Sequence, residues 1–149
     1  HFTQDEMLMF QSMVKAAVID DDMDVYRRVI EDAGMLQLDA PFTTEECGEY
    51  FSHFYEPVRE SRVMEWSGAY ATSIVRHTFD RTSAIAQYAT VPKSFVFIQR
   101  INLGLYALLG QLRSSGNYRR ISEELWPMTN ASASTPMGEA EAKWLASRD

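Results

Sequence analysis

Three side chains in one stretch of the sequence have types and a spacing that could bind a metal ion. Glu49, His53 and Glu56 follow one another at intervals of four and three residues, which places them on one face of a helix. Carboxylate and imidazole groups are common metal ligands. A di-iron bundle, however, needs paired Glu-x-x-His motifs, and the chain has none in that order. We therefore expect an ordinary helix surface here, and no bound metal.

Other motifs for catalysis or cofactor binding are missing from the sequence. It contains no Gly-x-Ser-x-Gly, no glycine-rich phosphate loop, no Cys-x-x-Cys and no Asp-Phe-Gly. The run Asp20-Asp21-Asp22 lacks the alternating ligands and turn glycine of a calcium loop, so we interpret it as helix capping. His77 and Asp80 favour a hydrogen bond on a helix surface. We predict no catalytic residue and no cofactor in this chain.

The composition favours one acidic domain. The chain has 149 residues, 46% of them hydrophobic, and a formal net charge of −7. Because nucleic acids repel a negative protein on average, we expect no nucleic-acid partner, and we interpret the pairs Arg27-Arg28 and Arg119-Arg120 as solvated helix faces. A lone cysteine, Cys47, and the lack of a signal-peptide pattern predict a cytoplasmic protein. Since the first residue is His1 rather than Met, we expect a longer parent polypeptide.

Helical signals recur along the whole chain, whereas strand signals are almost absent. Capping boxes at Thr3-x-x-Glu6 and Thr43-x-x-Glu46 open the first and third predicted helices. We predict helices over residues 4–19, after Asp22 as far as Gly34, from 43 or 44 towards Pro57, over 66–88 as one or two helices, from about 94 to the turn at 114–117, and over 118–126. The predicted fold class is all-α, an irregular helical bundle over residues 1–127. Residues 128–149 are predicted to form a polar linker, with a short terminal helix around 139–147.

The helix predicted after Pro92 is the most apolar segment of the chain. Gln99, Arg100 and Asn102 interrupt it and leave an apolar run, Ile101 to Leu112, that is shorter than the about 17–25 residues of a membrane-spanning helix. We therefore expect a buried helix of a soluble bundle and no transmembrane segment.

Arg100 is then predicted to be a structural arginine, because a charge on a buried helix needs a partner. Its guanidinium should pair with a carboxylate or with helix-end carbonyl groups inside the domain. The acidic candidates are Glu45, Glu46, Glu49, Glu56 and Glu60. The alternative is a functional arginine that binds an anionic ligand.

Four segments of the chain form a pattern of helices in a fixed order: MVKAAVIDDDMDVYRRVIEDAGML, the aromatic helix that ends in FYEPVRES, VPKSFVFIQRINLGLYALLGQL, and NYRRISEELWP. Together they resemble the C-terminal part of the AarF/UbiB family of atypical, protein-kinase-like proteins. The most specific pattern is Pro-x-x-Phe-x-x-x-x-Arg, formed by Pro92, Phe95 and Arg100, and the family's usual glycine follows at Gly104. The resemblance spans roughly residues 6–127.

The resemblance implies a parent protein that is an atypical kinase or ATPase and uses ATP and Mg²⁺. In such kinases the nucleotide-binding lysine, the catalytic aspartate and the Asp-Phe-Gly metal ligand precede the matched region, and none of them can be placed on this chain. We therefore expect a helical C-lobe remainder that supports an upstream kinase-like region of the same polypeptide and does not transfer phosphoryl groups alone. Some members of the family end in membrane-spanning helices, whereas this chain ends in a polar linker and GEAEAKWLASRD.

A second hypothesis is a free-standing helical module that binds a ligand or dimerises, as the effector half of a regulator does. In such a module Met, Tyr and Trp side chains would line an apolar pocket, and the eight methionines would pack adaptably around it. The sequence leaves a homo-oligomer open under both hypotheses.

Overall fold

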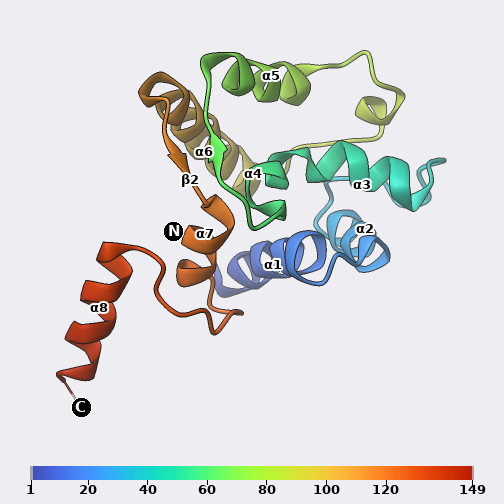
Figure 1. Ribbon diagram of the computed structural model, residues 1–149. Coiled ribbons are helices and arrows are strands. Elements are labelled where there is room, and N and C mark those ends of the chain that lie inside the picture. The colour runs from blue at the N-terminus through green and yellow to red at the C-terminus, as the bar shows by residue number, and fades with distance from the viewer. Residues whose placement is uncertain (1, 149) are drawn as a thin grey trace.

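The computed structural model of the protein describes residues 2–148 and is mostly helical, which confirms the predicted all-α, irregular bundle (Figure 1). Its elements are α1 (Gln4–Val14), η1 (Lys15–Ile19), α2 (Met23–Asp32), α3 (Thr44–Ser52), η2 (His53–Tyr55), α4 (Glu56–Arg59), β1 (Met64–Glu65), α5 (Gly68–Phe79), η3 (Ala84–Gln87), α6 (Lys93–Leu112), β2 (Ser115–Gly116), α7 (Tyr118–Leu125) and α8 (Pro136–Ala146). In Figure 1, α3 and α4 lie between α1 and α2 on one side and α5 and α6 on the other, and α8 stands apart.

The first two helices begin and end at the residues that the capping signals predict. The Thr3 hydroxyl accepts a hydrogen bond from the Glu6 amide, and the Glu6 carboxylate accepts one from the Thr3 amide. The helix continues through the π-helical turn η1 as far as Ile19. Asp22 then caps α2, and Gly34 follows it with a φ of 72°, a left-handed conformation that glycine adopts easily. The capping interpretation is therefore confirmed for Asp22.

The middle of the chain is broken into shorter pieces than the sequence indicates. The predicted capping box of Thr43 and Glu46 opens α3, but this helix gives way to the 3₁₀ turn η2, and Pro57 lies in the first turn of α4. The segment 66–88 forms α5 and the 3₁₀ turn η3. Between them Asp80 accepts hydrogen bonds from the amide and the hydroxyl of Thr82, which close a turn.

The hydrophobic core lies where α1, η1, α2 and α3 meet. Its largest fully buried side chains include Met13, Tyr26, Ile30, Leu36 and Cys47. A smaller buried group joins α5 to α6 and the short sheet, with Trp66 at its centre. The ring of Trp66 stacks on Tyr106 of α6 at a centroid distance of 4.7 Å, and β1 pairs with β2 in antiparallel register.

Two arginines bind segments of the chain that are far apart in sequence, so the interpretation of their basic pairs as solvated faces is wrong for these members. Arg27 donates hydrogen bonds to the Glu31 carboxylate and to the carbonyl groups of Ala40 and Phe42. Arg119 donates to Glu123 and to the carbonyl of Val18. Their side chains are only 20% and 15% exposed. An arginine's fork of N–H donors suits such uncapped backbone carbonyls.

The polar segment after α7 is fixed at its far end. The Glu124 carboxylate accepts hydrogen bonds from the hydroxyl of Thr135 and from the amide and hydroxyl of Ser134. Together they lower the pKa of Glu124. Thr135 in turn caps α8, which leaves Met137, Trp144 and Leu145 exposed.

Candidate functional site

A cavity of about 850 Å³ lies between the α1–α4 side of the molecule and the α5–α6 side. Its volume falls within the range of roughly 300–1,000 Å³ that small-molecule sites occupy. The two sides differ in chemistry. Residues of α1 to α4 contribute an apolar floor, whereas the end of α5, the segment that contains η3, and Gln99 and Asn102 of α6 contribute a polar rim.

The floor is built from aromatic and methionine side chains that the core already holds in place. Met13, Tyr26 and Phe51 are buried members of the core that also line the cavity. The rings of Tyr26 and Tyr55 meet edge to face at 6.2 Å. Burial raises the pKa of both phenols, so they stay protonated and uncharged in the folded protein. The floor therefore carries no charge at neutral pH.

A pair of histidines stands beside the polar rim. The rings of His53 in η2 and His77 in α5 lie 4.2 Å apart, and His77 Nε2 lies 2.9 Å from the carbonyl oxygen of Tyr50. Burial, and next the neighbouring His77, lower the pKa of His53. The hydrogen bond that the sequence predicts between His77 and Asp80 is replaced, because Asp80 bonds to Thr82 and His77 turns towards Tyr50.

Glu49, His53 and Glu56 do not come together as a set of metal ligands in the structure. His53 Nδ1 lies 3.9 Å from a carboxylate oxygen of Glu56, while Glu49 is exposed. Within residues 2–148 no group of three His, Cys, Asp or Glu side chains is placed to hold a metal ion.

The inner face of α6 closes the cavity. Phe95, Gln99, Asn102 and Tyr106 recur every three or four residues, so they share one face of the helix, and all four line the cavity. The Tyr106 hydroxyl donates a hydrogen bond of 3.1 Å to the carbonyl of Phe54, which ties α6 to η2. The Phe95 ring packs edge to face on Phe10 at 4.9 Å.

The outer face of α6 is apolar and uncovered, so the expectation of a buried helix is wrong. Large apolar side chains recur along it and are between 49% and 67% exposed: Phe97, Ile101, Leu105, Leu108 and Leu112. We call these five residues the α6 stripe. Gly110 is the only residue of α6 that is buried. The sequence shows that a helix is apolar, but the remaining elements cover only one of its sides.

Arg100 lies on the exposed part of α6 and forms no ion pair with any residue between 2 and 148, so its predicted buried pairing is wrong. The other residues of the family pattern take different positions. Pro92 precedes the first turn of α6, Phe95 faces inwards, and Gly104 is exposed with open space where a Cβ would lie. Gly110, in contrast, packs closely against the start of α5. A Cβ at this position would lie only 3.0 Å from the Ser67 carbonyl oxygen.

α6 is also the one helix in the described part of the chain whose length and composition would allow it to cross a membrane. Only 6% of its most apolar 18-residue stretch is buried. The polar side chains of Gln99, Arg100 and Asn102 lie near the middle of the helix. The prediction of no transmembrane segment depends on these polar side chains and stays a prediction.

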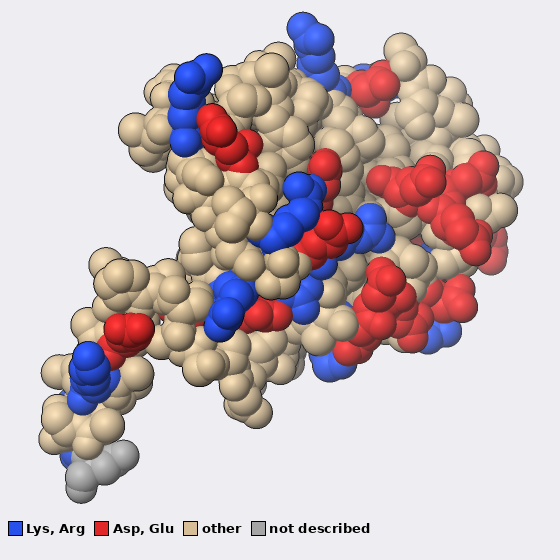
Figure 2. All heavy atoms as spheres, in the orientation of Figure 1, with Lys and Arg blue, Asp and Glu red and all other residues tan. Residues whose placement is uncertain are grey.

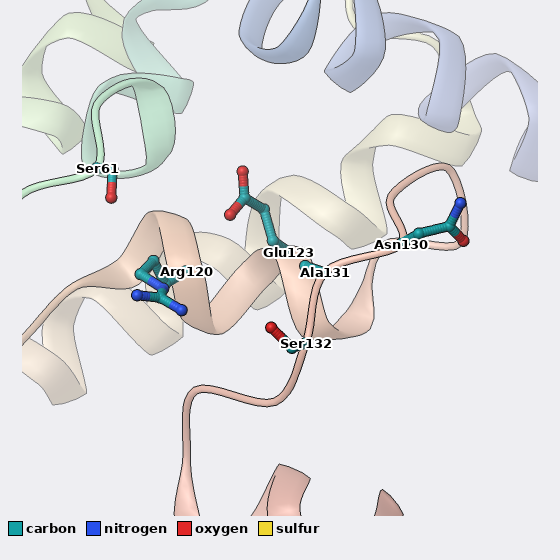
Figure 3. Close-up of a pocket in the computed structure, with 6 residues that line it drawn as sticks. All are labelled: Ser61, Arg120, Glu123, Asn130, Ala131 and Ser132. Atoms are coloured by element: carbon teal, nitrogen blue, oxygen red, sulfur yellow. The ribbon is translucent and has the colours of Figure 1, made fainter.

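A smaller and more polar hollow of about 370 Å³ lies between α7 and the segment that follows it (Figure 3). Arg120 and Glu123 of α7 line it with Ser61 and with residues 130–132. Glu123 is already bonded to Arg119, and Figure 3 shows its carboxylate turned towards the side of Ser61 and away from Ser132. The hollow therefore assembles no convergent set of polar groups.

In comparisons with known proteins, no family model, no curated protein and no solved structure matches this chain. The AarF/UbiB resemblance thus depends on the four sequence segments alone.

Proposed function

We propose that this chain is the helical C-terminal part of an AarF/UbiB-like atypical kinase or ATPase, and that it supports the upstream region by docking through the α6 stripe. The exposure of that stripe is the observation that carries the proposal. Scattered apolar side chains are normal on a protein surface, but five in register along one helix form a continuous patch of the kind that marks an interface. Val75 and Phe79 of the adjacent α5 are exposed as well.

The charges around the α6 stripe indicate what kind of surface would fit it. Between Trp66 and Arg113 the chain carries five lysines and arginines and a single acid, Asp80, although the whole protein has a net charge of −7. Figure 2 shows acidic side chains gathered over α2 and α3, away from α5. The docking surface of the upstream region is therefore apolar with an acidic rim.

In this proposal the chain has a mechanical role. ATP and Mg²⁺ belong to the upstream region, where the lysine, the catalytic aspartate and the Asp-Phe-Gly segment of the family would lie. Phosphoryl transfer requires those groups around the phosphates, so the isolated chain is expected to show no magnesium-dependent ATP hydrolysis.

The test is a binding experiment between this chain and the part of the parent polypeptide encoded upstream of it, each purified separately. Wild-type chain should bind, and a double variant of the α6 stripe, Leu105→Gln with Leu108→Gln, should not. Leu125→Gln on α7 is the matched control, because Leu125 is 75% exposed but lies outside the stripe. An upstream region without an Asp-Phe-Gly, equal binding by both variants, or a chain that only pairs with a second copy of itself would contradict the proposal.

A second candidate function is the free-standing helical module, and the cavity favours its ligand-binding form. The cavity has the size of a small-molecule site, and its floor combines methionine and aromatic side chains. Saturable binding of a small molecule by the isolated chain, together with no binding of an upstream region, would favour this candidate over the first.

A further inference from the structure

We propose that the cavity is a binding site for a neutral small molecule with a flat apolar ring system and a hydrogen-bonding group at one end. This inference deepens the second candidate function, and it holds whether or not the α6 stripe docks on an upstream region, because the stripe and the cavity lie on different faces of α6.

The apolar floor determines which part of the molecule goes deepest. Tyr50, Phe54 and Tyr55 line the cavity and are partly exposed, and the partly exposed Met35 adds a polarisable thioether. Aromatic side chains prefer to meet other rings edge to face or in offset stacks, and methionine sulfur packs well against ring edges. A flat ring system satisfies these preferences better than a flexible chain, which would also lose more conformational freedom on binding.

The polar rim fixes the other end of the molecule. The side-chain amides of Gln99 and Asn102 stand nearly one helical turn apart on the inner face of α6, and His77 faces the cavity from α5. These groups donate and accept hydrogen bonds without carrying a fixed charge. They therefore suit a carbonyl, hydroxyl or amide group.

The rim offers no net charge that would stabilise an ionic ligand. Asp80 and Arg81 are the two charged residues that line the cavity, they are neighbours in sequence, and both are exposed. Their opposite charges offset one another, and exposed charges are weakened further by solvent and salt. An anion or a cation would lose its hydration in the cavity and gain no unopposed charge in return.

The test uses the whole chain and the neutral dye Nile red, whose fluorescence rises in an apolar site. We expect saturable binding to one site. Ala86→Trp in η3 and Gln99→Trp in α6 each place a large ring in the cavity from a different element and should weaken dye binding at least about tenfold. Ala107→Trp and Gln111→Trp are the matched controls, because both residues are exposed on α6 outside the cavity, and binding should change less than about twofold. Circular dichroism shows which variants fold. If one of the two cavity variants does not fold, the other still tests the proposal.

The same assay separates the cavity from the α6 stripe and tests the ligand class. The double variant Leu105→Gln with Leu108→Gln should leave dye binding unchanged. Loss of dye binding in this variant would show that the dye binds to the α6 stripe and would overturn the inference. Among competitors of matched shape, neutral 2-acetylnaphthalene should displace the dye, and the anion 2-naphthoate should do so at least about tenfold less well. Equal or stronger displacement by the anion, or dye binding that survives both cavity-filling variants, would overturn the proposal. Failure of these tests leaves the docking experiment unaffected.

Discussion

The guanidinium of Arg119 and the carbonyl of Val18 are joined by a hydrogen bond of 2.8 Å across 101 positions of the sequence. The bond fastens α7 to the turn after α1. The same nitrogen also reaches the carbonyl groups of Val58 and Arg59 in the last turn of α4, at 3.3 and 3.4 Å. One side chain thus holds three separate segments together, in the role that the sequence assigns to Arg100.

Replacing Arg119 should therefore destabilise the fold. Arg119→Met keeps most of the apolar stem but leaves the Glu123 carboxylate and the Val18 carbonyl without their donor, at an expected cost of about 2–4 kcal/mol. Arg100→Met is the matched control and should change the free energy of unfolding by less than about 0.5 kcal/mol, because Arg100 is exposed. Urea denaturation of both variants measures the difference. Equal effects would show that Arg119 is no more structural than Arg100.

Two glycines of α6 should respond in opposite directions to alanine. At Gly110 the new Cβ would meet the Ser67 carbonyl oxygen at 3.0 Å and the Ala71 Cβ at 3.3 Å, so Gly110→Ala should destabilise the fold by about 1–3 kcal/mol. At Gly104 the Cβ enters open space, and the higher helix propensity of alanine should stabilise the fold by up to about 1 kcal/mol. Thermal unfolding compares the two. A gain in stability from Gly110→Ala would contradict the close packing of α5 on α6.

The histidine pair predicts a loss of stability in acid. Burial, and next His77, lower the pKa of His53 in the folded protein, whereas in the unfolded chain it is about 6.5. The unfolded state therefore takes up this proton first, and the folded state is destabilised as the pH falls through about 6.5 towards the lowered value. We expect the melting temperature to fall more between pH 7.5 and 5.5 in the wild type than in His53→Gln. Identical falls would remove His53 as the cause.

Cys47 should be inert to thiol reagents until the protein unfolds. Its side chain is fully buried in the core, and burial raises the pKa of the thiol, so little reactive thiolate forms. Its reaction with Ellman's reagent at pH 8 should be at least about a hundredfold slower in buffer than in concentrated urea. Rapid labelling in buffer would mean that the contact between α2 and α3 opens readily.

The parts of the fold that short stretches of sequence determine could be predicted. Capping boxes at Thr3 and Thr43, the cap at Asp22 and the left-handed Gly34 each act within a few residues, and all four occur as expected. The spacing of apolar residues does not determine whether residues 66–88 form one helix or two, because the break between α5 and η3 depends on the hydrogen bonds between Asp80 and Thr82.

The candidate site was harder to predict, because it depends on which surfaces meet. The partners of Arg119 are backbone carbonyls, which no residue type reveals in advance. The pairing of His53 with His77 joins helices that are separated by 24 positions, although both residues carried a signal as rare histidines in a chain that has three. The apolar composition of α6 predicts a helix correctly, but it does not predict that the outer face is exposed. Composition does not show whether another element covers that face.

The most direct test of the central proposal is whether the α6 stripe is covered in the parent polypeptide. Hydroxyl-radical footprinting of the parent protein and of this chain alone reports the exposure of Phe97, Leu105 and Leu108 in each. The account predicts that these three side chains are oxidised readily in the isolated chain and are strongly protected in the parent, while Leu125 of α7 is oxidised equally in both. Equal oxidation of the stripe in the two proteins would contradict the docking role of α6.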